Sequence, residues 1–168
     1  ERVWILDGLP EIPVDAQCWR IRQGYLAEPT DDEPFTDDPN IVPRVGRIRS
    51  IEDSDGSMRF MHTIKRGTGL VRIEMERDLS DEAFHSAWPG TSGRRLTKTR
   101  WRVHDAQHTW EVDRFENLKL VLLEVELSHA QESFEIPSWL AGRIVREVTE
   151  EPKFRNAAIA ARQGLLED

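Results

Sequence analysis

The chain has one cysteine, Cys18, in 168 residues, and it has no long apolar run. A single cysteine excludes an intramolecular disulfide framework and favours a reducing compartment, the cytoplasm. No apolar segment approaches the roughly 20 residues of a membrane-spanning helix, so we expect no membrane partner. The sequence begins at Glu1 instead of Met and shows no secretory signal, which suggests that upstream residues were removed.

Positive charge is also scarce, because 31 Asp and Glu residues outnumber 23 Lys and Arg residues and give a net charge of −8. Broad nucleic-acid binding needs a cationic surface and is therefore not expected. A length of 168 residues with 38% hydrophobic residues suits one ordinary domain with a real core. We therefore predict a single domain over residues 1–168, while the oligomeric state and the pathway stay open.

Segments typical of β-strands dominate what is present, and the turn residues Asp55-Gly56 and Gly67-Thr68-Gly69 separate three of them. The expected strands lie at 1–6, 18–26, 44–52, 58–65, 69–77, 95–103, 109–115 and 118–128. Residues 27–46 are acidic, rich in proline and without a period, which predicts a mobile surface loop. Ser80 predicts the start of a short helix that ends at Pro89. The tail, 138–166, is expected to be helical in pieces broken at Pro152.

Charged residues recur at alternate positions of these segments, so they share one face of each expected strand. The sets are Arg47 and Arg49; Arg72, Glu74 and Glu76; Lys98, Arg100 and Arg102; Glu111 and Asp113; Glu124 and Glu126. A polar face turned to water explains any one such strand. Both signs of charge recur on consecutive strands, however. This favours a charged interior inside a closed barrel of about eight strands, wide enough for one small ligand.

A lining of this kind predicts a polyanionic ligand that binds together with a cation. Arginine presents a planar fork of donors to phosphate oxygens, and lysine adds a point charge. Carboxylates beside phosphate would repel it unless a hard cation lies between them, and Mg²⁺ is held by one or two carboxylates plus phosphate oxygens. Such a metal polarises the phosphoryl group or helps to activate water.

The order and spacing of several stretches resemble the bacterial CYTH proteins, the triphosphate tunnel metalloenzymes, over nearly the whole chain. These stretches are RQGYL, RIR, HTIKRGTGLVRIEMER, GRRLTKTRWRV, WEVDRF, LVLLEVEL and REVTEEPKFRNAAIA. The resemblance implies an α+β fold dominated by antiparallel β-structure. This fold is a closed eight-stranded barrel with flanking helices and a C-terminal helical segment. Family members include inorganic triphosphatases, thiamine triphosphatases and class IV adenylate cyclases.

The resemblance also assigns roles to the charged residues. It implies triphosphate binding by Arg47, Arg49, Lys65, Lys98 and Arg100, with Arg72 as a weaker candidate. It implies Mg²⁺ or Mn²⁺ as the cofactor, held by Glu1, Glu74, Glu76, Glu124 and Glu126. Asp113 is a nearby acid that holds a metal-bound water or a lysine. The carboxylates expected to assist the attacking water are Glu74, Glu76, Asp113, Glu124 and Glu126.

The first strand departs from the family signature, which is Glu-x-Glu-x-Lys. The stretch ERVWIL aligns Glu1 with the second glutamate and Val3 with the lysine, and the first glutamate would precede residue 1. This substitution predicts weakened metal affinity or turnover. The leading prediction is a metal-dependent triphosphatase that acts on inorganic or small organic triphosphates, and the departure in the first strand leaves two alternatives open. One is a non-catalytic binder of polyphosphate or nucleotide, and the other is an enzyme similar to adenylate cyclase.

Overall fold

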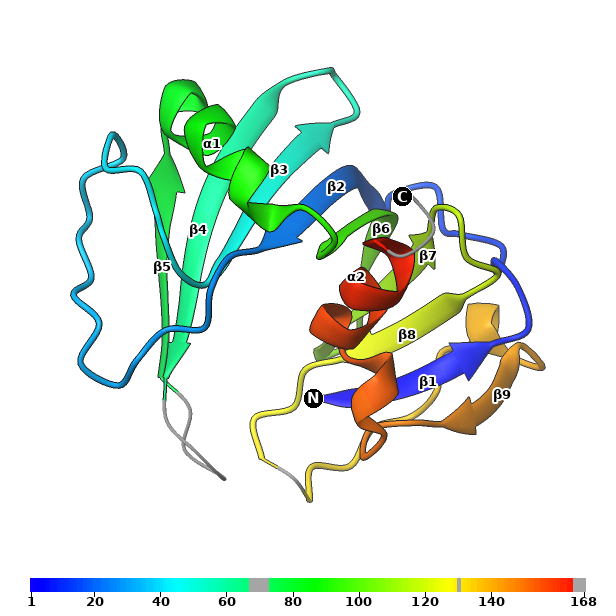
Figure 1. Cartoon of the computed structure of the whole chain (residues 1–168). Coiled ribbons are helices and arrows are strands. Elements are labelled where there is room, and N and C mark those ends of the chain that lie inside the picture. The colour runs from blue at the N-terminus through cyan, green and yellow to red at the C-terminus, as the bar shows by residue number, and fades with distance from the viewer. Residues whose placement is uncertain (67–72, 130, 165–168) are drawn as a thin grey trace. The chain divides into compact units, whose positions relative to one another are not determined.

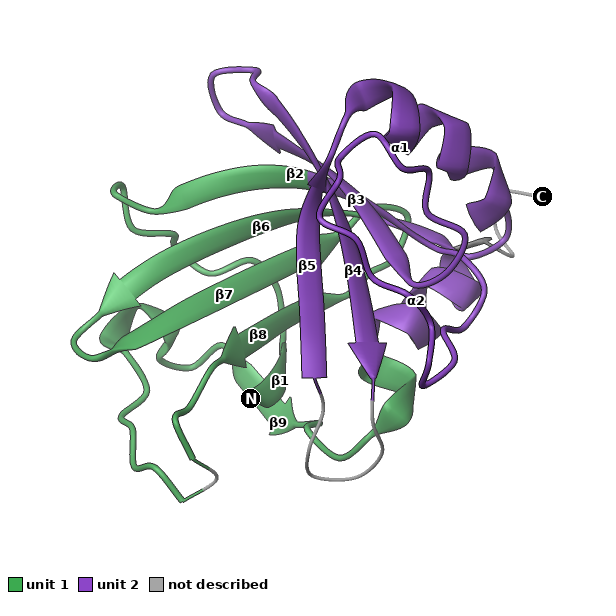
Figure 2. Ribbon diagram, turned by 90° about the vertical axis from the view of Figure 1, so that its left-hand side faces the viewer, with its two compact units in different colours: residues 1–20, 97–155 green, residues 21–96, 156–168 purple. Residues whose placement is uncertain are grey.

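The protein was analysed as a computed structural model that describes residues 1–66, 73–129 and 131–164. Two compact units make up the chain, and each is described by itself (Figure 2). Unit 1 comprises Glu1–Arg20 and Thr97–Arg155, and unit 2 comprises Ile21–Leu96 and Asn156–Asp168. The single domain over 1–168 stays a prediction. No helix among the described residues is long and apolar enough to cross a membrane.

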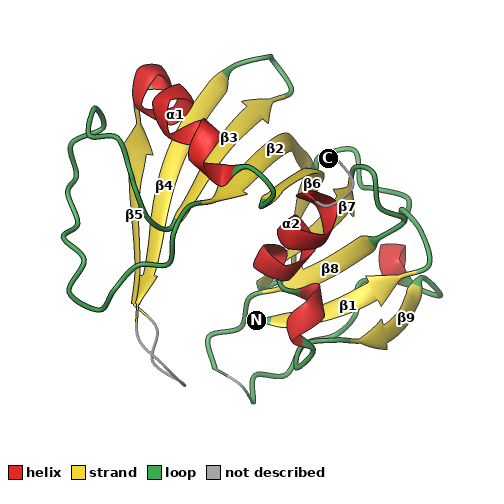
Figure 3. Ribbon diagram, in the orientation of Figure 1, coloured by secondary structure: helices red, strands yellow, loops and turns green. Residues whose placement is uncertain are grey.

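Nine strands follow the predicted segments closely, with one addition near the C-terminus (Figures 1 and 3). They are β1 (Arg2–Leu6), β2 (Gln17–Tyr25), β3 (Arg47–Asp53), β4 (Met58–Arg66), β5 (Ile73–Leu79), β6 (Arg95–Asp105), β7 (His108–Phe115), β8 (Val121–Val125) and β9 (Ile144–Glu147). The first residues of the segment expected at 69–77, and the turn expected at 67–69, lie outside the described part of the chain. The ladders within each unit pair antiparallel, in agreement with the hairpin prediction.

The prediction of a closed eight-stranded barrel is wrong. The strands follow the order β5-β4-β3-β2-β6-β7-β8-β1-β9, and the two outermost strands are not paired with each other, so the described sheet is open. Strand β9, which pairs Glu147 with Trp4 and Arg146 with Ile5, occupies the edge of β1 that β8 leaves free. Alternation in the sequence reports which face a residue is on, but it does not report which strand pairs with which edge.

The core of unit 1 lies on one face of β1, β7 and β8. Its buried members are Trp4, Leu6, Trp110, Val112, Leu123, Val125 and Leu140. Phe134 packs edge-on against both Trp4 and Trp110, at centroid distances of 5.6 and 5.7 Å. Because side chains alternate along a strand, burial of this face turns Glu111, Asp113 and Glu124 to the other.

Unit 2 buries the corresponding face of β3, β4 and β5 under helix α1 (Asp81–Ala87). Ser80 accepts a hydrogen bond from the Ala83 backbone N–H at 3.2 Å, which confirms the predicted N-cap. The helix ends at Ala87, and the 3₁₀ helix η1 (Trp88–Thr91) carries Pro89 in its first turn. Phe84 packs against Phe60 at 4.7 Å and against Trp88 at 5.2 Å. This packing leaves Arg47, Arg49 and Glu76 on the other face.

The tail is only partly helical. It contains the 3₁₀ helices η2 (Ser138–Leu140) and η3 (Pro152–Phe154), and then α2 (Asn156–Gly164), with β9 between η2 and η3. The helical prediction for 138–166 is therefore wrong at 144–147. Residues 27–46 form no helix or strand beyond one bridge between Ala27 and Val45, as expected for a loop. The mobility of this loop stays a prediction.

Candidate active site

Strands β6, β7 and β8 of unit 1 place charged residues opposite one another on one face. The register pairs Arg100 with Asp113, Arg102 with Glu111, and Glu111 with Glu124. Directly opposed residues of antiparallel strands point to the same side of the sheet. The parity argument therefore gave the correct shared face for these five residues and for Lys98, which lies two positions before Arg100.

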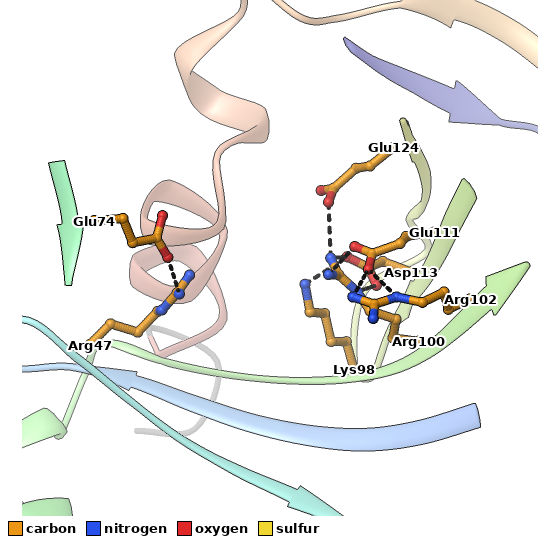
Figure 4. Close-up of polar contacts among 8 residues, drawn as sticks. All are labelled: Arg47, Glu74, Lys98, Arg100, Arg102, Glu111, Asp113 and Glu124. Carbon is orange, nitrogen blue, oxygen red and sulfur yellow. Dashed lines mark hydrogen bonds and ion pairs between the residues drawn. The ribbon is translucent and has the colours of Figure 1, made fainter. Parts of the chain in front are cut away.

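Asp113 is the centre of this group, because it accepts hydrogen bonds from two cations (Figure 4). Lys98 Nζ lies 2.6 Å from Asp113 Oδ2, and Arg100 donates through Nε and Nη2 to the two carboxylate oxygens, both at 2.6 Å. Asp113 and Lys98 are 0% and 2% exposed, so water screens these contacts little. Burial alone raises the pKa of Asp113, but Arg100 and Lys98 outweigh it and lower that pKa to about 2.

Glu111 and Glu124 hold the other side of Arg100. Glu124 Oε2 accepts from Arg100 Nη2 at 2.9 Å, and Glu111 pairs with Arg100 Nη1 and also, at 2.6 Å, with Arg102 Nη2. Three cations thus face three carboxyl groups in unit 1. The basic residues are compensated within the protein, so a triphosphate binding to them has to displace carboxylates or bring a cation that engages them.

The pKa of Glu124 is shifted in the direction opposite to that of Asp113. Burial and the neighbouring Asp113 raise the pKa of Glu124 to about 7, and Glu1 adds a smaller effect of the same sign. Val3 lies directly opposite Glu124 in the β1–β8 register and is 8% exposed. An apolar side chain therefore occupies the position where the family signature carries a lysine, and among the described residues the ion pair of Glu124 is with Arg100 of β6 and not with β1.

Glu126 follows the last residue of β8 and is exposed. It shares strand parity with Glu124, and Glu1 precedes β1 on the strand that pairs with β8. Glu1, Glu124 and Glu126 therefore belong to one end of the β1–β8 ladder. Glu124 forms an ion pair with Arg100, and no ion pair among the described residues involves Glu1 or Glu126.

Unit 2 carries a second charged group on β3, β4 and β5. Arg49 Nη2 lies 2.5 Å from Glu76 Oε2, Arg47 Nη2 lies 3.3 Å from Glu74 Oε1, and Lys65 Nζ lies 2.9 Å from Glu74 Oε2. Burial raises the pKa of Glu74, but Lys65 and Arg47 outweigh it and hold that pKa below its usual value. In the structure Glu74 and Glu76 are counter-ions of the basic residues, and their role as metal ligands stays a prediction.

Two residues of this group were missed by the sequence analysis. The Thr63 hydroxyl accepts from Arg47 Nη2 at 3.1 Å and donates to Glu76 Oε2 at 2.8 Å, so it joins the two strands that flank β4. The Tyr25 hydroxyl accepts from Gln23 Nε2 at 2.6 Å, and burial raises the pKa of this phenol against the influence of Arg47. Thr63 shares parity with Lys65, a signal that identifies it once the strand is known.

The structure does not describe every residue that the sequence analysis assigned to the site. Arg72 lies outside the described residues. Within the described ranges, no group of three or more His, Cys, Asp or Glu side chains is arranged to hold a metal ion by itself. Mg²⁺ commonly needs only one or two carboxylates when phosphate oxygens and waters complete its shell. The carboxyl groups of Glu1 and Glu124 fit that donor set, because both supply oxygen ligands and the charge of Glu1 contributes to raising the pKa of Glu124.

Comparison with known proteins identifies the class to which this fold and charged site belong. No protein-family model matches the chain. The inorganic triphosphatase of Nitrosomonas europaea is 35% identical over 146 residues, which is 83% of this chain and 83% of that protein. The inorganic triphosphatase of Acetivibrio thermocellus is 38% identical over 139 residues, which is 81% of this chain and 76% of that protein.

The fold is similar to a solved structure of the same kind. The crystal structure of the inorganic triphosphatase NE1496 aligns with a TM-score of 0.59 and 25% identity over 95% of both chains. A second structure, described as the hypothetical protein NE1496, aligns with a TM-score of 0.58 and 27% identity over 95% of both chains. The chain belongs to the CYTH family of triphosphate tunnel metalloenzymes, as its sequence motifs predicted.

Proposed function

We propose that this protein is a metal-dependent hydrolase that cleaves a phosphoanhydride bond of inorganic triphosphate. The observation that carries the proposal is the similarity to two inorganic triphosphatases, at 35% and 38% identity over more than four fifths of the chain. A second support is chemical. Buried arginine and lysine side chains face carboxylates on the same strand face, and this residue set suits a triphosphate that binds with a hard cation.

In unit 1 we assign phosphate binding to Lys98 and Arg100, with Asp113 holding both in place. Three hydrogen bonds from these two cations engage most of the acceptor sites of Asp113, so it is a positioning residue and keeps the cations aimed at the ligand. Positive charge at these atoms offsets the negative charge that develops on the transferring phosphoryl group. Arg47, Arg49 and Lys65 of unit 2 receive the same binding role as a separate proposal.

We assign the metal to one or two of the carboxyl groups of Glu1, Glu124 and Glu126, with phosphate oxygens and waters in the rest of its shell. A divalent metal bound there supplies Lewis acidity to a phosphate oxygen or lowers the pKa of a water. Because the pKa of Glu124 is raised to about 7, this carboxyl group has to lose a proton before it holds a cation, and metal affinity falls at acidic pH. Mg²⁺ and Mn²⁺ are the candidates, since both accept carboxylate and phosphate oxygens. The single Cys18 accords with a reducing, cytoplasmic location.

The test is a phosphate-release assay with inorganic triphosphate, ATP and thiamine triphosphate, each with Mg²⁺, with Mn²⁺ and with a chelator. We expect turnover of inorganic triphosphate only with metal. Glu124→Gln keeps the shape of the side chain but removes its charge, so it should abolish metal-supported turnover. Glu150→Gln, an exposed residue of the same unit, is the matched control and should keep the wild-type rate. Normal turnover and metal dependence in Glu124→Gln would exclude Glu124 from the metal site.

Val3 favours one alternative, a protein that binds triphosphate or nucleotide without hydrolysing it. Its isopropyl group lies opposite Glu124, where a lysine would otherwise compensate both the acid and the ligand. Calorimetric binding of triphosphate with no release of phosphate under any metal would select this alternative. Release of pyrophosphate from ATP with formation of a cyclic nucleotide would select the cyclase-like one.

A further inference from the structure

A cavity of about 540 Å³ lies in unit 2 between the loop 33–45 and the β4–β5 ladder. The strand residues that line it are His62, Ile64 and Arg77. The register pairs His62 with Arg77, whereas the next pair, Thr63 and Glu76, belongs to the charged group described above. Neighbouring residues of a strand point to opposite faces, so the cavity is on the other side of this ladder from that group. Its volume is within the range of small-molecule sites.

Arg77 places a buried positive charge at the wall of this cavity. Its side chain is 6% exposed, and the guanidinium forms no ion pair with any described carboxylate within 4.0 Å. It donates from Nε to His62 Nδ1 at 3.1 Å, from Nη2 to the Ile41 carbonyl at 2.8 Å, and from Nη1 to the Asp38 carbonyl. These bonds engage three of the five N–H groups of a guanidinium. A buried charge without a paired counter-charge is rare in proteins.

His62 does not compensate this charge. It accepts the Arg77 N–H through Nδ1, so its proton is on Nε2, which donates to the Val45 carbonyl at 2.8 Å. The imidazole is therefore neutral, and burial lowers its pKa. Burial lowers the pKa of Arg77, and the charges of Asp37 and Asp38, two exposed residues of the loop, only partly oppose this shift. Glu33 and Arg44 also line the cavity, and their opposite charges leave its net charge unchanged.

Apart from Thr36, the rest of the wall is apolar. Phe35 stacks on the His62 ring at a centroid distance of 6.2 Å, and the other apolar lining residues are Pro34, Ile41, Val42, Pro43, Val45 and Ile64. Ile41 and Val42 are 51% and 43% exposed, which makes them two of the large hydrophobic side chains that the described fold leaves open to water. A ligand in the cavity would cover apolar surface and neutralise Arg77 at the same time.

We propose that this cavity is a second ligand site, separate from the charged groups, for a small organic carboxylate with an apolar body. The carboxylate accepts hydrogen bonds from the remaining Arg77 N–H groups, and the body contacts Phe35, Val42 and Ile64. An ionised carboxylate on a buried arginine gains a charge-assisted hydrogen bond, and the apolar walls exclude water from it. The competing explanation is that Arg77 only fastens the loop to β5 through the two carbonyls.

Octanoate and octanamide are the probes that separate these explanations, because they share a chain and differ in charge. Binding is measured by calorimetry and by NMR chemical-shift changes of the intact chain. We expect octanoate to bind at least about tenfold more tightly than octanamide, with shifts at Val42 and Ile64. Equal binding of the two probes, or no binding of octanoate up to its solubility limit, would overturn the proposal.

Substitutions at Val42 test the charge requirement without disturbing the Arg77 contacts. Val42→Glu places a negative charge at an exposed wall position and should weaken octanoate binding by at least about tenfold through repulsion. Val42→Gln is the neutral control of similar size and should change it by less than about threefold. The same loss in both variants would contradict a carboxylate site. Hydrolysis of triphosphate should stay unchanged in both, which separates this site from the proposed activity.

Discussion

Asp113 shows most clearly how single residues organise the charged face of unit 1. It is fully buried, and its two oxygens accept from Lys98 and Arg100 at 2.6 Å. A buried carboxylate that binds two cations is more suited to orient them than to coordinate a metal, because its lone pairs are already engaged. Of the two roles that the family resemblance implied for Asp113, holding a lysine is the one that the contacts support.

Asp113→Asn should therefore lower stability as well as activity. The amide keeps the shape but leaves Lys98 and part of Arg100 without a buried counter-charge, and breaking a buried pair costs about 3–5 kcal/mol. Urea unfolding measures the change in the free energy of unfolding. Asp15→Asn, at an exposed position of unit 1, should change it by less than about 0.5 kcal/mol. A loss below about 1 kcal/mol for Asp113→Asn would show that the pairing is energetically unimportant.

Val3 is the residue where the chain departs from its family, and the register places it opposite Glu124. Val3→Lys should tighten triphosphate binding and raise turnover, since a hydrogen bond to a charged group contributes about 1.5–3 kcal/mol. Repulsion from Lys98 and Arg100 will offset part of this gain. Calorimetric titration with a slowly hydrolysed triphosphate analogue measures it, with Val3→Met as the uncharged control. Equal affinity in the lysine and methionine variants would mean that position 3 does not reach the ligand.

At the scale of elements, each charged face is positioned by burial of the opposite face. Trp110 and Val112 enter the core of unit 1, so Glu111 and Asp113 of the same strand point away from it. In unit 2, helix α1 covers Ile48 and Leu79 and has the same effect on Arg47 and Glu76. The helix therefore supports the charged group indirectly, by fixing which way the strands face.

Ser80→Ala tests how much the start of α1 contributes. The substitution removes the acceptor for the Ala83 N–H, and loss of an N-cap typically costs about 1 kcal/mol. Thermal or urea unfolding should show this decrease, while Ser80→Asp, which keeps an acceptor, should stay close to the wild type. If alanine and aspartate destabilise the protein equally, the side-chain cap does not stabilise the helix.

At the scale of the whole molecule, stability should depend on pH in two opposite ways. Glu124 has a pKa of about 7 in the folded protein against an ordinary 4.5, so between these values the folded state binds more protons than the unfolded chain. Stability therefore falls as pH rises through this window. Asp113 has a pKa of about 2 against 3.8, so its contribution is present above pH 3.8 and is lost as pH falls toward 2.

Unfolding by urea at several pH values without added metal checks this prediction. Between pH about 4.5 and 7 the wild type should lose stability relative to Glu124→Gln, which cannot titrate at this position. Glu150→Gln should follow the wild type throughout. A constant difference between wild type and Glu124→Gln across the window would mean that Glu124 titrates normally in the folded protein.

The amino-acid order was enough to predict the described strands other than β9, the charged face of several of them and the family. Period-two alternation is a local property, so the shared face of Lys98, Arg100 and Arg102 was readable without coordinates. The same is true of the Ser80 cap, which depends on residues within one helical turn. The resemblance to CYTH proteins rested on the order and spacing of several short motifs, and the relatives confirmed it.

Strand pairing and the contacts between charged side chains depend on the folded chain, because they join residues that are distant in sequence. The four residues of β9 are too few for a periodic signal, and their pairing with β1 follows from an open edge 138 to 143 positions away in the chain. Thr63 joined the charged group of unit 2 through its contacts with Arg47 and Glu76 on the two strands that flank β4, and alternation within one strand does not specify such cross-strand neighbours. Arg77 was unremarkable in the sequence, and its significance arises from burial beneath a loop whose path depends on contacts distant in sequence.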